Sequence, residues 1–137
     1  MIRVVVDPNV LISALIGPSG SAPHQVVMAW QAGLIEFVVS PLLLRELQDV
    51  LRRPKFARFQ AQVGPYVAMI ESDALLVEDP SDPPGTTADP GDDYLVALGR
   101  AGAADGIVSG DRHLLEIDGL VPPALSPRTL LDRLSTA

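Results

Sequence analysis

The chain has 137 residues, of which 47% are hydrophobic and 20% are charged, and it contains no cysteine. This length allows one ordinary domain, and the composition excludes disordered, collagen-like and low-complexity chains. Without cysteine, disulfide frameworks, thiolate zinc sites and cysteine nucleophiles are excluded too, which leaves carboxylates as the expected chemistry. The formal net charge of −7 argues against a protein that holds nucleic acid by its overall charge.

The charges are unevenly distributed along the chain. Residues 71–118 contain twelve acids and two bases, whereas the other residues contain five acids and eight bases. The sequence therefore predicts an acidic body that carries a small basic segment. The bases of that segment are Arg45, Arg52, Arg53, Lys55 and Arg58.

The start of the chain does not look like a targeting segment. It lacks the basic start of a signal peptide, and Asp7 interrupts its apolar run early. No apolar run approaches the ~18 residues of a membrane-spanning helix. We therefore expect a cytoplasmic protein without membrane association.

Strands and helices alternate in the predicted order of elements. Ile2–Val6 is an almost continuous apolar run, typical of a strand buried on both faces, and Pro8 begins a short helix that ends at Ile16. Ser40 and Pro41 form a helix start, in which serine caps and proline occupies the first turn. The remaining elements of this half are a helix at 22–32, a strand at 35–39, a helix from 41 that ends before Pro54, a helix at 58–72 and a strand at 74–77.

The second half continues the alternation after a long proline-rich segment. Residues 78–91 contain four prolines and no apolar periodicity, so we expect a long loop there. The whole pattern predicts a single α/β domain at 1–137, with a sheet of about five mainly parallel strands and helices on both faces. The elements of this half are a helix at 92–103, a strand at 106–109, a short helix at 111–117, a strand within 120–126 and a helix at 128–134.

Two aspartates follow predicted strands. Asp7 comes directly after the first strand, and Asp111 comes after the strand at 106–109 and Gly110. Because sites in such sheets form beyond the carboxyl ends of the strands, we expect both carboxylates at the same edge. The structural alternative is that each aspartate only caps the helix that follows it.

Helical geometry selects two further acids. On the helix from residue 41, Glu46 lies at the border of the buried stripe, whereas Asp49 lies toward the solvent face. On the helix from residue 92, Asp92 projects nearer the buried side than Asp93 does. The structural alternatives are a surface ion pair for Glu46 and a favourable helix-dipole interaction for Asp92.

Convergence of these four acids requires a counterion. Two like charges about 4 Å apart repel by roughly 4 kcal/mol at an effective dielectric near 20. Oxygen ligands without cysteine or paired histidines favour Mg²⁺ or Mn²⁺ over zinc. Such ions activate water and stabilise charge on a phosphoryl group, which is the chemistry of phosphodiester cleavage.

Three motifs stand in order along the chain. They are Val4-Val5-Val6-Asp7-Pro8-Asn9-Val10-Leu11-Ile12-Ser13-Ala14-Leu15, Asp89-Pro90-Gly91-Asp92-Asp93, and Ile107-Val108-Ser109-Gly110-Asp111-Arg112-His113-Leu114-Leu115. These motifs resemble those of the PIN (PilT N-terminus) domain family, and in particular its branch of bacterial toxins from toxin–antitoxin pairs. The resemblance covers essentially the whole chain, in order and at the expected spacing. It implies a Rossmann-like five-stranded parallel sheet, metal-dependent ribonuclease activity on RNA, and a small antitoxin partner.

The resemblance also assigns roles by position. It implies that Asp7, Glu46, Asp92 and Asp111 hold Mg²⁺ or Mn²⁺ and carry the catalysis, with Asp93 as the alternative to Asp92. Where many members have Thr or Ser after the first Asp, this chain has Pro8, which removes a hydroxyl and a backbone donor. Supporting hydrogen bonds are expected from Asn9, Ser109 and, more distantly, Ser13.

The remaining polar and aromatic residues have competing interpretations. The basic segment Arg45–Arg58 is either a solvated helix end or a contact for RNA phosphates or an acidic antitoxin segment. His24 and His113 are expected to be surface or packing residues, and Trp30 to pack in the core or in a homodimer interface.

Two other functions of α/β domains fit the sequence poorly, and two variants of the PIN interpretation stay open. A receiver domain needs a late lysine, whereas the only lysine here is Lys55, and a haloacid-dehalogenase-type phosphatase needs Asp-x-Asp where this chain has Asp7-Pro8-Asn9. A catalytically silent PIN fold that binds RNA or protein, or a housekeeping nuclease that is not a toxin, stays open.

Overall fold

The computed structural model describes the backbone of residues 1–80 and 90–136, and the side chains of these residues except 90–93. Its strands form one sheet in the order β3-β2-β1-β4-β5, and all neighbouring strands are parallel. β1 therefore lies at the centre, where the chain order along the sheet reverses. The strands are β1 (Ile2–Val6), β2 (Ile35–Val39), β3 (Leu75–Leu76), β4 (Gly106–Val108) and β5 (Ala124–Leu125).

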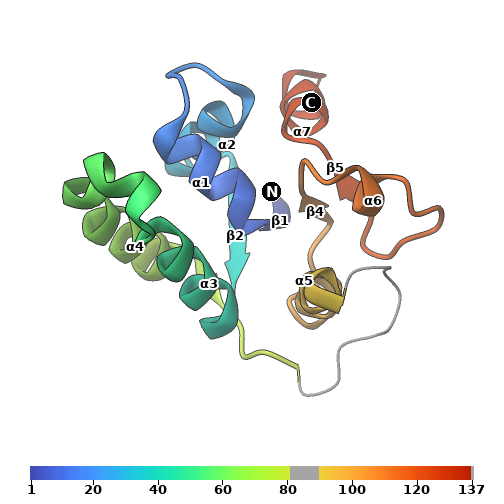
Figure 1. Ribbon diagram of the computed structural model, residues 1–137. Helices are drawn as coiled ribbons and strands as arrows, with labels where there is room; N and C mark the ends of the chain where they lie inside the picture. The colour runs from blue at the N-terminus through green and yellow to red at the C-terminus, as the bar shows by residue number, and fades with distance from the viewer. Residues whose placement is uncertain (81–89, 137) are drawn as a thin grey trace.

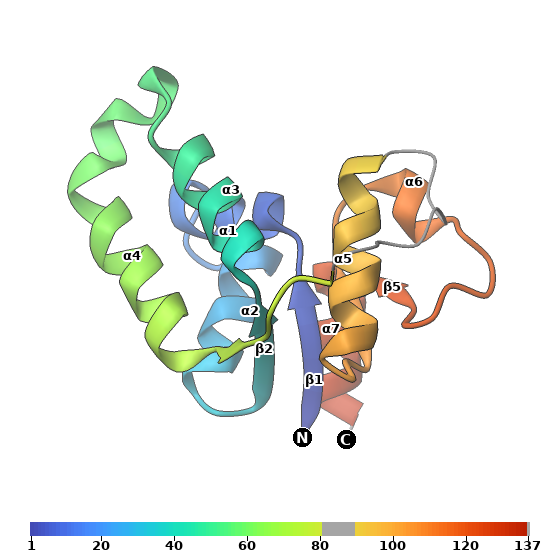
Figure 2. The ribbon, with the colours of Figure 1, turned by 90° about the horizontal axis from the view of Figure 1, so that it is seen from below.

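Helices connect the parallel strands and cover both faces of the sheet. Figure 1 shows α1, α2 and α7 on one face and α5 on the other, which confirms the predicted α/β architecture. Both views place β1 between α3 and α5 (Figures 1 and 2). The helices are α1 (Pro8–Ile16), α2 (Ala22–Gln31), α3 (Pro41–Leu51), α4 (Gln60–Asp73), α5 (Pro90–Ala101), α6 (Arg112–Leu115) and α7 (Pro127–Thr136), with a 3-10 helix, η1 (Pro54–Phe59), between α3 and α4.

A side-chain cap followed by a proline sets the starts of α1, α2 and α3. Asp7 caps α1, Ser21 caps α2 and Ser40 caps α3, each by accepting a hydrogen bond from a backbone N–H of the first turn. A proline occupies the first or second position of each helix, where its missing N–H costs nothing. These local signals explain why the predicted starts agree with the observed ones.

The predicted helix at 58–72 differs from what is observed. Residues Pro54–Phe59 form the 3-10 helix η1, and α4 begins only at Gln60. Phe56, at φ −107° and ψ 19°, departs from helical geometry and separates this segment from a regular helix. The segment is a surface turn at the far end of α3 and α4 from the sheet, as Figure 2 shows.

Other boundaries shift by a few residues. α5 starts at Pro90 rather than at residue 92, because proline is tolerated in a first turn. β5 is limited to two residues, since Pro122 and Pro123 cannot donate to the strand ladder. The predicted loop at 78–91 lies mostly outside the described residues.

The core fills the space between the sheet and both helical layers. Strands β1, β2 and β4 contribute side chains that are almost fully buried, as parallel strands covered on both faces require. Trp30 is 7% exposed and stacks on Phe37, with ring centroids 4.6 Å apart. Trp30 is therefore a core residue. Among the described residues, no helix combines the length and hydropathy that crossing a membrane requires.

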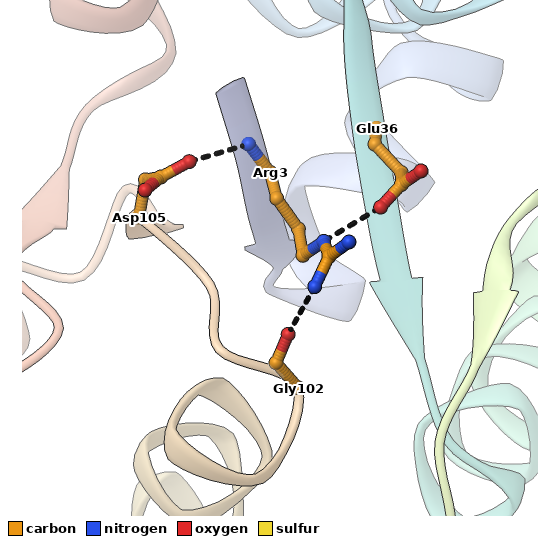
Figure 3. A network of polar contacts seen from close by, with 4 residues as sticks. All are labelled: Arg3, Glu36, Gly102 and Asp105. Atoms are coloured by element: carbon orange, nitrogen blue, oxygen red, sulfur yellow. Dashed lines mark hydrogen bonds and ion pairs between the residues drawn. The ribbon is translucent and has the colours of Figure 1, made fainter. Parts of the chain in front are cut away.

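A polar network closes the amino-terminal edge of the sheet (Figure 3). Arg3 faces Glu36 directly across the β1–β2 pair, and its Nε donates to Glu36 Oε1 at 2.6 Å. Its Nη1 donates to the Gly102 carbonyl at 2.9 Å, and its backbone N–H donates to Asp105 Oδ2 at 2.8 Å. Arg3 thus ties β1 to β2 and to the turn after α5, at the edge opposite Asp7.

A substitution at Gly102 would test how tightly the turn after α5 packs on the sheet. A Cβ at Gly102 would lie 2.8 Å from Val38 Cγ1, and Val38 is a fully buried residue of β2. We expect Gly102→Ala to lower the free energy of unfolding by about 1–3 kcal/mol through overpacking, as measured by urea denaturation. Gly110→Ala is the control, because its Cβ meets nothing within 4 Å, and it should be neutral or slightly stabilising. Equal effects of the two variants would contradict this packing.

Candidate active site

A cleft of about 390 Å³ opens beyond the carboxyl ends of β1 and β4. This is the topological switch point of the sheet, where α/β folds place their ligands. A larger hollow of about 490 Å³ between α1, α2 and α4 has mostly apolar walls, without a carboxylate among its described lining residues. The cleft is therefore the better candidate for chemistry. It is lined by Asp7, Asn9, Val10, Ser13, Pro23, Gly110, Asp111 and Pro127.

Asp7 is buried, with 5% exposure, and is the most buried of the predicted acids whose side chains the structure describes. Its Oδ1 accepts a hydrogen bond from the Asn9 backbone N–H at 2.9 Å, and its Oδ2 accepts one from Ser109 Oγ at 2.8 Å. A buried carboxylate needs such partners, because leaving its charge unpaired is costly. Each carboxylate oxygen retains acceptor capacity beyond these bonds.

Ser109 links the two aspartates. Its side chain is fully buried, and its Oγ donates to Asp7 while accepting from the Asp111 backbone N–H at 3.0 Å. Asp111 is half-buried and caps α6, since its Oδ1 accepts from the His113 backbone N–H at 2.9 Å. Asp7 and Asp111 thus each cap a helix, and both also line one cleft, so capping is observed but is not their only structural role.

The other cleft residues named from the sequence come from α1. Asn9 and Ser13 are exposed, and both line the cleft beside Asp7. Asn9 contributes its backbone N–H to the Asp7 carboxylate. A supporting role for the side chains of Asn9 and Ser13 stays a prediction.

Glu46 extends from α3 toward α5. It is exposed, and its Oε2 accepts a hydrogen bond from Tyr94 Oη at 2.6 Å. Burial raises the pKa of the Tyr94 phenol, and the hydrogen bond to Glu46 with the charges of Glu46, Asp7 and Asp79 raises it further. The hydroxyl therefore remains a neutral donor at physiological pH, in the field of three carboxylates. Asp49 is exposed on the same helix, as expected.

Sequence reasoning missed Tyr94 and Asp79. The Oδ2 of Asp79 accepts from the Leu42 backbone N–H at 2.9 Å, and its Oδ1 is buried without a hydrogen-bond partner in the described part of the chain. Asp79 lies three residues beyond the end of β3, so the position of an acid shortly after a strand was a usable signal. Tyr94 directly follows the Asp92–Asp93 pair, but nothing in the sequence pairs it with Glu46. The side chains of Asp92 and Asp93 lie outside the described residues.

The donor chemistry of the cleft fits a hard divalent cation, but the described ligand set is partial. Asp7 and Asp111 offer carboxylate oxygens, the ligands that Mg²⁺ and Mn²⁺ prefer. Among side chains that the structure describes, no group of three acids or histidines is close enough to hold a metal ion. The described residues thus provide two carboxylates with the oxygen donors that such a cation prefers, but not a complete set of ligands.

The bases of the basic segment lie on the surface. All five of them are exposed, and η1 buries none of its side chains. Lys55 Nζ lies 5.1 Å from the ring centroid of Phe56, and Arg58 Cζ lies 4.8 Å from that of Phe59. Adjacent aromatic rings therefore hold two of the cations in place.

The two histidines occupy different surroundings. His113 is exposed and contacts Asp111 through its backbone N–H. The Nδ1 of half-buried His24 accepts a hydrogen bond from the Gly20 N–H at 3.1 Å. These contacts agree with the surface and packing roles expected for them.

Comparison with solved structures shows the same fold in other proteins. A protein described as PAE2754 from Pyrobaculum aerophilum aligns over 99% of this chain and 91% of its own, with TM-score 0.63 and 19% identity. The structure of VapBC2 from Rickettsia felis bound to a DNA fragment from their promoter aligns over 91% of this chain and 98% of its own, with TM-score 0.63 and 13% identity. A search of curated proteins finds no match.

A family model described as PIN domain matches residues 3–113, a range that reaches from β1 into the start of α6 and includes both cleft aspartates. The match confirms the resemblance inferred from the three motifs. It extends over most of the sequence, so this chain belongs to the PIN domain family.

Proposed function

We propose that this protein is a Mg²⁺- or Mn²⁺-dependent endoribonuclease and the toxin of a toxin–antitoxin pair. The observation that carries the proposal is the meeting of Asp7 and Asp111 in one cleft at the switch point of a PIN fold. Such a pair of carboxylates suits a divalent cation better than a purely structural role, since capping α1 and α6 does not require them to share a cleft.

The described residues have distinct parts in this proposal. Asp7 and Asp111 would hold the cation, with Glu46 from α3 and Asp92, or Asp93 in its place, from α5. A bound divalent cation would supply activation of a water molecule and charge stabilisation on the phosphoryl group. Ser109 holds Asp7 and the Asp111 backbone in fixed relation through its two hydrogen bonds. Asn9 fixes the other oxygen of Asp7 through its backbone N–H.

The partners in this proposal are single-stranded RNA and a small antitoxin protein. The exposed basic segment from Arg45 to Arg58 offers positive charge for RNA phosphates or for an acidic antitoxin segment. The VapBC2 structure from Rickettsia felis has the same fold, which supports the toxin–antitoxin assignment. The homodimer and the cytoplasmic location expected from the sequence remain predictions.

We propose further that residues 1–137 form one PIN domain. The family match ends at residue 113, but the following elements belong to the same core. Leu125 of β5 and Leu130 of α7 are buried in the cluster that contains β1 and β4. Residues 114–136 therefore complete the domain rather than begin another.

Metal dependence is the first prediction. Purified protein should cleave single-stranded RNA with Mg²⁺ or Mn²⁺, and EDTA should abolish cleavage. Asp7→Asn should lower the rate by at least about 100-fold, because a metal contributes several kcal/mol to transition-state stabilisation and ~1.4 kcal/mol is tenfold. The matched control Asp49→Asn, an exposed acid of α3, should retain activity. Cleavage that survives both EDTA and Asp7→Asn would contradict the proposal.

The same assay separates the two acids at the start of α5. Asp92→Asn should reduce metal-dependent cleavage by a similar factor, whereas Asp93→Asn should have a small effect. The reverse result would assign the metal to Asp93. A chain that binds RNA without cleaving it under any metal condition would favour a silent RNA-binding PIN module.

RNA affinity should depend on the basic segment. Replacing Arg52, Arg53, Lys55 and Arg58 by alanine should weaken binding and reduce the slope of log affinity against log salt by about 0.7 for each phosphate that the variant leaves without a cation. Fluorescence anisotropy with the inactive Asp7→Asn background measures this without cleavage. Arg133→Ala on α7 is the control and should leave the slope unchanged. An unchanged slope in the fourfold variant would show that the segment does not contact RNA.

A further inference from the structure

Glu46 and Tyr94 form a bridge between two helices on either side of β1. Glu46 lies on α3 and Tyr94 on α5, 48 residues apart, and the Tyr94 hydroxyl donates to Glu46 Oε2 at 2.6 Å. Figures 1 and 2 both show the central strand between these helices. The charges of Glu46 and Asp7 both act on the Tyr94 hydroxyl, so the bridge lies near the carboxylate that follows β1.

Without the hydrogen bond, the two side chains would differ in conformational freedom. Glu46 is exposed on the helix surface, where a glutamate samples several rotamers. Tyr94 is half-buried and packs against the hydrophobic core, so its ring is held by its surroundings. The hydrogen bond thus transfers the fixed position of the tyrosine to the glutamate carboxylate. Its length is typical of a charge-assisted O–H···O⁻ bond.

The chemistry of a phenol leaves the carboxylate able to bind a ligand. Tyr94 has one hydroxyl proton, and it occupies one acceptor position of Oε2, while Oε1 and the remaining position of Oε2 can still bind a ligand. A lysine or arginine at residue 94 would instead neutralise Glu46 and compete with a cation. A phenylalanine would fill the same volume without holding the carboxylate.

We propose that Tyr94 is a positioning residue that holds Glu46 in place to receive the divalent cation of the cleft. This inference rests on the function proposed above, and it assigns a role to a residue outside the acidic motifs. Partners of metal ligands of this kind orient the ligand, and their loss typically reduces metal affinity by about 10–100-fold.

Direct Mn²⁺ binding tests the inference without relying on activity. Free Mn²⁺ measured by electron paramagnetic resonance should give a Kd about 10-fold higher for Tyr94→Phe than for the wild-type chain. Tyr66→Phe is the matched control, because Tyr66 is the only other tyrosine and its hydroxyl donates to the Leu11 carbonyl at 2.7 Å. Its Kd should not change.

A double-mutant cycle separates positioning from general damage. In a Glu46→Gln background, Tyr94→Phe should cause no further loss of Mn²⁺ affinity, since the residue acts through Glu46. RNA cleavage should show the same dependence: Tyr94→Phe should raise the Mn²⁺ concentration for half-maximal rate, and saturating Mn²⁺ should restore the rate. Glu46→Asp provides a second variant, because its shorter carboxylate cannot keep the same bond to Tyr94.

The outcomes distinguish this inference from the proposed function. If Asp7→Asn abolishes Mn²⁺ binding but Tyr94→Phe binds as tightly as the wild type, the positioning role is overturned and the metal site stands. Tighter binding by Tyr94→Phe would overturn it too, because the hydroxyl would then be a competitor of the cation. A wild-type chain that binds no Mn²⁺ would overturn both.

Discussion

The parallel pairing of β1 with β4 is the constraint on which the candidate site depends. The register matches Val6 with Val108, and the next hydrogen bond runs from the Asp7 N–H to the Val108 carbonyl at 2.8 Å. This brings Ser109 Oγ to the Asp7 carboxylate across 102 positions of sequence. A slip of one residue would turn every side chain of β4 to the other face, so the register that buries the core also assembles the site.

Asp7 carries two functions that are usually considered as alternatives. It caps α1, which explains an aspartate there on local grounds, and it lies in the cleft with Asp111. A cap alone can remain at the surface, where water solvates the carboxylate. Asp7 is instead buried, and charge-assisted hydrogen bonds from Asn9 and Ser109 offset its desolvation. The cap does not by itself require this burial, which agrees with the metal-binding role proposed for Asp7.

The elements with local signals could be predicted from the sequence. β1, α1 and the start of α3 combine an apolar run or stripe with a capping residue and a proline, and the structure agrees with all three. The edge strand β3 is shorter than the predicted 74–77, and β5 occupies two residues of the predicted range 120–126, because the extent of both strands depends on partners and prolines rather than on apolar composition. The 3-10 helix η1 was not predicted: residues 54–57 had no assigned element, and the next helix was expected to begin at residue 58 rather than at Gln60.

Some residues of the candidate site could likewise be predicted from local signals, whereas others depend on how the helices pack. Asp7 and Asp111 could be placed at one edge because each follows a strand, and parallel strands end together. The Glu46–Tyr94 contact could not, since it depends on how α3 and α5 sit relative to β1. Asp79 could have been found by the rule that identified Asp7, namely that an acid after a strand is a candidate, but the short edge strand before Asp79 gave a weak signal.

The acidic net charge does not exclude the proposed nucleic-acid substrate, because α3 connects the Glu46 carboxylate to a stretch of exposed bases. Its first turn is tied down by Ser40 and by Asp79, which accepts from the Leu42 N–H. Its middle presents Glu46 toward Tyr94, and its end leads into the exposed bases of η1. A helix of 11 residues is about 16 Å long, so one rigid element carries both Glu46 and the adjacent Arg45. Any displacement of α3 would therefore move the Glu46 carboxylate and the start of the basic segment together.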